Sequence, residues 1–132
     1  MSKRVVFVFI FALVGFLNHT KAQVDPPELR CISIEDNGDV TLNWIPTLDP
    51  LNQFVSYQVY RIVNGVSGPI GPALTNRLQF VYTDKAVPLP PRAGFGYYIV
   101  VNFNDGSSKV SLPSDTLSPM ELNLTKINPN TS

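Results

Sequence analysis

The distribution of proline limits what this chain can fold into. All twelve prolines lie between Pro26 and Pro129. An interior proline removes a backbone donor and costs a helix roughly 3 kcal/mol. No stretch after residue 22 keeps a 3.6-residue apolar period for three turns. We therefore expect strands joined by loops, and no long helix.

Short segments of alternating or β-branched character recur between turns rich in Gly, Asn, Asp and Pro. The expected strands cover 29–34, 40–44, 54–63, 79–83, 95–103, 109–112 and 116–122, the last two forming one strand interrupted near Pro113. Pro69 and Pro72 predict a strand-free region before Leu78. About seven short strands at this spacing are typical of an all-β, immunoglobulin-like antiparallel sandwich of two sheets.

Alternation assigns residues to the core. Residues 40–44 place three apolar side chains on one face, and residues 54–63 place two more inward. The predicted structural core is Val40, Leu42, Trp44, Tyr57 and Val59. In the first strand Leu29, Cys31 and Ser33 share a face, so we expect Cys31 to be a buried small hydrophobe. A reactive thiol or an intermolecular bridge is the alternative for Cys31.

The first residues predict an export signal. Lys3 and Arg4 precede an unbroken apolar run of 13 residues over 5–17, and Ala22 follows a polar stretch. This pattern is typical of a secretory signal peptide, and the run is shorter than the ~20 residues of a membrane-spanning helix. An uncleaved anchor is the alternative. We expect cleavage after Ala22, no membrane span in the mature protein, and a secreted or cell-surface location.

The sequence divides into a signal peptide over 1–22, one domain over 23–122 and a polar tail or linker over 123–132. It leaves open whether this is a whole protein or the first module of a longer one. After cleavage, seven basic side chains remain against ten acidic ones, with no basic cluster. This charge balance excludes the basic surface by which proteins bind nucleic acid or anionic lipid.

Several motifs in order also look familiar. They are Pro26-Pro27-x-Leu29, Val40-x-Leu42-x-Trp44, Tyr57-x-Val59-Tyr60-Arg61, the strand with Tyr97 and Tyr98, and Ser111-x-Pro113-Ser114. This order resembles a fibronectin type III domain across roughly 26–122. The resemblance implies that Trp44 and Tyr57 pack together in the core. The segments 82–84 and 114–118 are similar to sandwich modules in large secreted proteins of gliding Bacteroidetes. Whether Tyr97 or Tyr98 faces the core stays open, and no Arg-Gly-Asp motif is present.

The mature chain offers few groups for catalysis. The only histidine of the full sequence, His19, lies in the predicted signal, so the mature chain has none, and Cys31 is its only cysteine. Ser-His-Asp and Cys-His sites and thiolate or imidazole zinc sites are therefore excluded. Glu35, Asp36 and Asp39 are expected to be polar residues of a hairpin turn. The alternatives are a catalytic carboxylate pair of Asp36 and Asp39, as in glycoside hydrolysis, and weak calcium binding by all three residues. We predict no enzyme, no cofactor and no metal.

Exposed aromatic and turn residues supply the remaining candidates. The predicted binding surface comprises Tyr60, Phe103, Asn104 and Asp105, with one of Tyr97 or Tyr98. The leading hypothesis is a spacer or a protein–protein interaction and adhesion module whose partner is an unknown protein. The alternative is a carbohydrate-binding accessory module that stacks a polysaccharide on Tyr60 and Phe103. The sequence also leaves the oligomeric state open.

Overall fold

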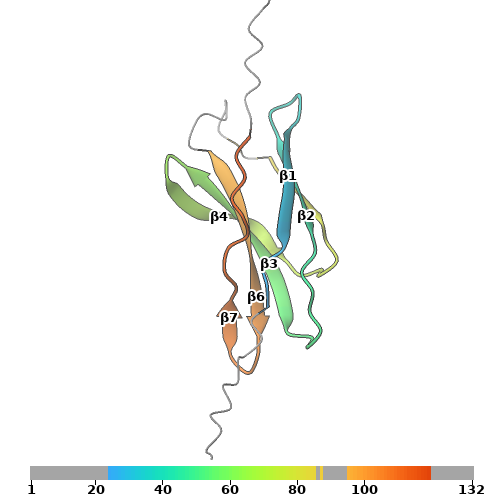
Figure 1. Ribbon diagram of the computed structural model, residues 1–132. Coiled ribbons are helices and arrows are strands. Elements are labelled where there is room, and N and C mark those ends of the chain that lie inside the picture. Colours follow the sequence, from blue (N-terminus) through green and yellow to red (C-terminus); the bar gives the residue numbers. More distant parts are fainter. Residues whose placement is uncertain (1–23, 86, 88–94, 120–132) are drawn as a thin grey trace, which may run out of the picture.

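The computed structural model describes residues 24–85, 87 and 95–119, and these form an all-β structure (Figure 1). The strands are β1 (Glu28–Ile34), β2 (Val40–Ile45), β3 (Phe54–Val63), β4 (Val66–Leu74), β5 (Val81–Asp84), β6 (Gly96–Asn104) and β7 (Ser108–Val110). They build two sheets, in the orders β1-β2-β5 and β4-β3-β6-β7. Every strand pair is antiparallel. The predicted all-β arrangement of two antiparallel sheets is confirmed.

The core lies between the two sheets and combines aliphatic and aromatic side chains. The five residues predicted for the core all lie in it: Val40, Leu42, Trp44, Tyr57 and Val59 are 0–3% exposed. The Trp44 and Tyr57 rings meet edge to face, with centroids 5.7 Å apart. Tyr97 faces inward and is fully buried, whereas Tyr98 faces the outside of its sheet.

A β-bulge in β1 overturns the prediction that Cys31 is buried. Leu29 pairs with Trp44 and Cys31 pairs with Asn43, so Arg30 is an extra residue in the ladder. Because side chains alternate with a period of two, one extra residue reverses the faces of everything after it. Ile32 therefore packs against the core, and Cys31 is exposed.

The strand β4 is a second correction, because it contains the two prolines that predicted a strand-free region. Pro69 lies opposite Tyr60, and a register shift separates the Leu74 and Ile70 pairings. β4 is the edge of its sheet. An edge strand needs hydrogen bonds on one side only, so it tolerates proline where a central strand does not. The position of a strand within its sheet is not visible in its own sequence.

The strand predicted to resume after Pro113 does not do so among the described residues: over 116–119 there is only an isolated bridge between Leu117 and Tyr97, and 120–122 lie outside the described residues. Two serines continue the pairing with β6 beyond β7. β7 ends at Val110, and the chain then runs beside β6. The hydroxyls of Ser111 and Ser114 accept hydrogen bonds from the backbone N–H groups of Val101 and Ile99, each at 2.9 Å. The two hydroxyls therefore accept hydrogen bonds from the backbone of β6 beyond the point where regular strand pairing stops.

A buried polar network fastens one sheet to the other. The carboxylate of Asp84, at the end of β5, accepts 2.8 Å hydrogen bonds from the Arg61 guanidinium of β3 and from the Tyr97 hydroxyl of β6. Asp84 is only 2% exposed. Burial, together with the hydrogen bond to Asp84, raises the pKa of Tyr97 well above its ordinary value. The network therefore favours the protonated phenol and ties β5 to the other sheet.

The predicted signal peptide and the polar tail over 123–132 lie outside the described residues, as does most of the stretch over 86–94. Within the part of the chain that the structure describes, no helix has the length and apolar character to cross a membrane.

Candidate functional site

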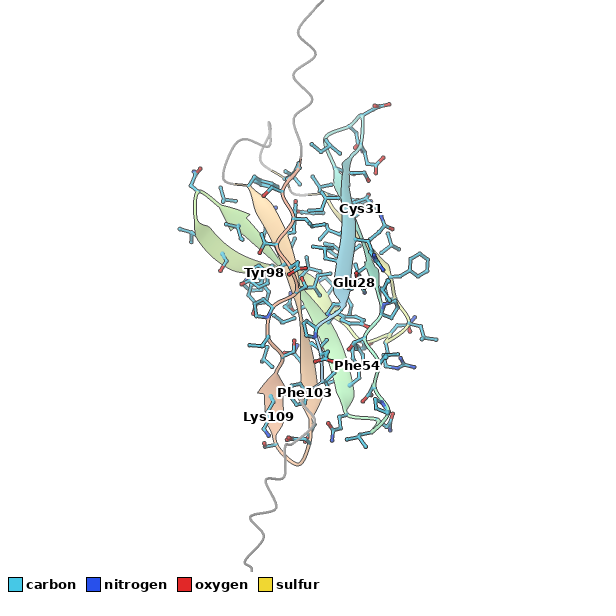
Figure 2. All side chains as sticks on the ribbon, in the orientation of Figure 1. Glu28, Cys31, Phe54, Tyr98, Phe103 and Lys109 are labelled. Carbon is cyan, nitrogen blue, oxygen red and sulfur yellow. The ribbon has the colours of Figure 1, made fainter. Side chains whose placement is uncertain are left out.

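Tyr60 does lie on the outer face of the four-stranded sheet, where it contacts Tyr98. The two residues are cross-strand partners on β3 and β6. Their rings are stacked with centroids 4.9 Å apart and planes 5° from parallel. The Tyr98 hydroxyl also reaches Ser67 of β4 at 3.2 Å. Tyr98, labelled in Figure 2, is therefore the tyrosine that belongs to the surface.

Phe103 is not part of that surface. It is 3% exposed and belongs to the core. Its face follows from the alternation of β6, because Tyr97 and Phe103 are six residues apart and so point the same way. The prediction that Phe103 joins an exposed aromatic platform is wrong.

Asn104 and Asp105 lie at the far end of β6, in the turn that leads to β7. They are about 20 Å from Tyr98 along the strand, at roughly 3.4 Å per residue. The Asn104 side chain accepts a hydrogen bond from the Gly106 N–H at 3.0 Å, and Asp105 pairs with Lys109. Both side chains stabilise their own turn, so the four predicted surface residues do not form one site.

The acidic turn between β1 and β2 is also organised by its own hydrogen bonds. The Asn37 amide group donates to the Asp39 carboxylate and accepts from the Asp39 N–H, both at 3.0 Å. Ser33 donates to Glu35 at 3.3 Å. Among the described residues, no group of three or more His, Cys, Asp or Glu side chains is placed to hold a metal ion.

Sequence reasoning missed a group of exposed apolar side chains beside β5, which we call the β5 patch. Its members are Ile45, Leu78, Phe80 and Val81, which are 44%, 63%, 59% and 37% exposed. A 3.0 Å hydrogen bond from the Trp44 N–H to the Phe80 carbonyl holds this segment beside the end of β2. Val81 pairs with Asn43 at the start of β5. The signal in the sequence was Leu78 and Phe80 flanking the expected start of a strand.

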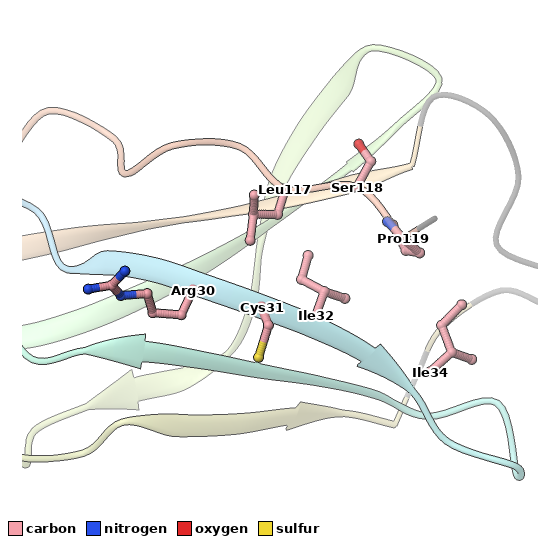
Figure 3. A pocket seen from close by; sticks show the side chains of 7 residues that line it. All are labelled: Arg30, Cys31, Ile32, Ile34, Leu117, Ser118 and Pro119. Atoms are coloured by element: carbon pink, nitrogen blue, oxygen red, sulfur yellow. The ribbon is translucent and has the colours of Figure 1, made fainter. Parts of the chain in front are cut away.

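A groove runs along β1, the free edge of the three-stranded sheet (Figure 3). We call it the β1 groove. It has a volume of about 430 Å³, and its lining is Arg30, Cys31, Ile32, Ile34, Leu117, Ser118 and Pro119. Ile32 points toward Leu117 in this view, whereas the Cys31 sulfur is turned to the other side of the strand.

A smaller cavity of about 270 Å³ lies under the 46–53 loop. Its lining is Val24, Asp25, Leu48, Asp49, Pro50, Leu51 and Gln53. The Asp49 carboxylate accepts 2.8 Å hydrogen bonds from the backbone N–H groups of Gln53 and Phe54. Asp49 is thus engaged in shaping the loop.

Comparison with known proteins gives a weak structural likeness only. No family model and no curated protein matches the sequence. Two solved structures of pectate lyase Pel3 from Pectobacterium carotovorum are similar to it, each with a TM-score of 0.49, at 21% and 19% sequence identity. The matches cover 73% and 76% of this chain. This chain corresponds to 27% and 28% of the length of those proteins.

These neighbours require one correction. The sequence predicted that the chain is not an enzyme, and this prediction is contradicted because the similar solved structures belong to an enzyme. The likeness is too weak to assign any residue or activity to this chain. The exclusion of an enzyme is withdrawn, and no catalytic role is put in its place.

Proposed function

We propose that this chain is an exported sandwich module of the fibronectin type III-like kind that makes protein–protein or adhesive contacts at the cell surface or outside the cell. The strand order supports the fold assignment. In seven-strand immunoglobulin-type sandwiches the first, second and fifth strands share one sheet, and the third, sixth and seventh share the other. β1-β2-β5 and β3-β6-β7 follow this division, with β4 beside β3. The predicted signal peptide supports the location.

The β5 patch is the observation that carries the contact function. Single exposed apolar residues are ordinary, whereas several gathered together mark interaction sites. Here Leu78 and Phe80 are more than half exposed and flank a single residue. Val81 follows Phe80 in the chain, and the hydrogen bond from the Trp44 N–H to the Phe80 carbonyl brings the backbone next to Ile45 close to the same segment. The segment is ordered by its own hydrogen bonds, including that from the Leu78 N–H to the Asn76 side chain at 3.0 Å. An ordered apolar surface loses little conformational entropy when a partner covers it.

Site-directed photo-cross-linking tests this function. A benzoyl-phenylalanine at position 80, in the β5 patch, should give an adduct of discrete higher mass on intact producing cells. The same group at position 66 is the control, because Val66 is 74% exposed and belongs to the opposite sheet. Adducts at neither position, or equally at both, would remove the β5 patch as a contact site.

The alternative function, binding of a polysaccharide, would use Tyr60 and Tyr98, because Phe103 is buried. Each of these rings uses one face to stack on the other, which leaves less ring face for a sugar than two coplanar aromatics would offer. Retention of the protein on an insoluble polysaccharide, lost in Tyr98→Ala and kept in Phe80→Ala, would favour this alternative over protein contact.

A further inference from the structure

The four edges of the two sheets are not equally able to accept another strand. β5 and β7 are short, with 4 and 3 residues. β4 has 9 residues but contains Pro69 and Pro72, which cannot donate hydrogen bonds. β1 has 7 residues and no proline, and in the part of the chain that the structure describes it pairs with β2 alone. Among the described strands, β1 is therefore the longest edge strand without a proline.

The core-facing side of β1 is only partly covered. Ile34 lies opposite Val40, yet Ile34 is 44% exposed whereas Val40 is fully buried. Ile32 lies opposite Leu42 and is partly buried. The β1 groove opens at this point, between β1 and the segment over 117–119. An added strand would place every second side chain over Ile32 and Ile34, because strand side chains alternate.

Arg30 gives the groove its charge. Among the described residues that line the groove it is the only charged one, and its side chain is 56% exposed. Arg30 is also the bulged residue, and bulges commonly redirect a side chain. Its ion pair with Glu28, at 3.1 Å, joins two exposed side chains. Such pairs are worth about 0–1 kcal/mol, so a second carboxylate can compete for the guanidinium.

We propose that the β1 edge binds an extended peptide as an added antiparallel strand, with apolar side chains at alternate positions and an acidic residue at its C-terminal end. Main-chain hydrogen bonds supply the affinity in this mode of recognition, and the pockets for alternate side chains supply the selectivity. The antiparallel direction brings the C-terminal end of the peptide to Arg30. This inference rests on the proposed function and names the class of protein segment that this edge accepts.

The test uses the exported protein and two synthetic peptides, acetyl-Thr-Val-Thr-Val-Thr-Val-Glu-amide and the same peptide ending in Lys. Hydrogen exchange of the backbone N–H groups is followed residue by residue. We expect the Glu peptide at saturation to slow exchange in β1 at least tenfold, and to bind about fivefold more tightly than the Lys peptide. Arg30→Gln should remove this difference between the peptides. Ile34→Lys should weaken both peptides at least tenfold, whereas Val66→Lys in β4 should leave both unchanged.

Three results would overturn the proposal. One is unchanged exchange in β1 at saturating peptide. Another is protection of β4 or β7 in place of β1. The third is a concentration-dependent dimer that Ile34→Lys abolishes, which would assign the groove to a second copy of the chain. A cross-link at position 80 that persists in Ile34→Lys would show that the contact function survives when the β1 site fails.

Discussion

β6 and β1 have similar lengths and very different burial. Six of the nine residues of β6 are buried, against one of the seven residues of β1. β6 lies between β3 and β7, whereas among the described strands β1 borders only β2. Figure 1 shows β1 at the margin of its sheet. The difference teaches that position and composition go together: the central strand β6 is rich in aromatic and β-branched residues, whereas the edge strand β1 carries Glu28, Arg30 and Ser33.

β2 supports this view from within the same small sheet as β1. It lies between β1 and β5, and three of its six residues are buried, in strict alternation. A three-stranded sheet therefore has one strand that acts as core and two that act as edges. The predictions below test this division between centre and edge, from the largest expected effect to the smallest.

Trp44→Ala should lower the free energy of unfolding by about 3–5 kcal/mol, as is typical when a large buried aromatic is truncated. Trp44 is 3% exposed on a central strand and contacts the Tyr57 ring. Chemical denaturation followed by circular dichroism measures the change. Ile45→Ala is the matched control one residue further on; Ile45 is 44% exposed, so it should cost less than about 0.5 kcal/mol. Equal losses of unfolding free energy for Trp44→Ala and Ile45→Ala would contradict the assignment of the two residues to opposite faces of β2.

Asp84→Ala should cost about 3 kcal/mol, because it removes the buried carboxylate that accepts hydrogen bonds from both the Arg61 guanidinium and the Tyr97 hydroxyl. This variant tests whether β5, an edge strand, contributes to stability through a single side chain that reaches the core. Asp84→Asn keeps the shape and one carbonyl acceptor, so it should cost less than Asp84→Ala. A loss below 1 kcal/mol in urea denaturation of Asp84→Ala would show that β5 is held mainly by its ladder with β2.

Alkaline pH should destabilise the central strands through their buried tyrosines. Burial raises the pKa of Tyr57 and of Tyr97. A phenol whose pKa is higher in the folded state keeps its full stabilising contribution below the unfolded pKa, near 10, and loses it as the pH rises above that value. For Tyr97, whose pKa is raised well above its ordinary value, the loss at pH 11 is about 1.4 kcal/mol. Tyr57 adds a loss of the same sign.

Denaturant midpoints between pH 8 and 11.5 measure this effect, with tyrosinate absorbance as the second readout. Tyr97→Phe should show a shallower loss of stability above pH 10 than the parent protein. An identical slope in the two proteins would mean that Tyr97 ionises as easily in the folded state as in the unfolded state.

Ile34→Ala should change the free energy of unfolding by less than about 0.5 kcal/mol, since Ile34 is half-exposed at the edge of the sandwich. Thermal unfolding of the free protein measures this directly. A cost above 2 kcal/mol would place Ile34 in the core and remove the contrast between β1 and β6.

The sequence predicted the parts of the fold that depend on local periodicity. Alternation placed Val40, Leu42 and Trp44 on the core face, because β2 runs without interruption from turn to turn. Alternation failed where a strand contains a bulge. The extra residue Arg30 moves Cys31 to the surface, and a bulge is defined by the partner strand, which no single segment contains.

The candidate site was less predictable than the fold, because it depends on which strands become neighbours. Tyr60 was assigned to the surface correctly, but its partner Tyr98 is fixed by the register of β3 against β6. Phe103 was misplaced because the inward phase of β6 was unresolved between Tyr97 and Tyr98. The β5 patch was missed because exposure of Leu78 and Phe80 depends on where the strand begins.

The two prolines of β4 have a consequence for growth into larger assemblies. A fibre built by strand pairing needs two long, compatible edges on every subunit, so that each added copy offers a fresh end to the next. Among the described strands, Pro69 and Pro72 interrupt one long edge, and β1 is the long edge without a proline. A strand added to β1 would therefore leave no second uninterrupted long edge among the described strands for the next copy, and pairing of this kind would end after a single addition.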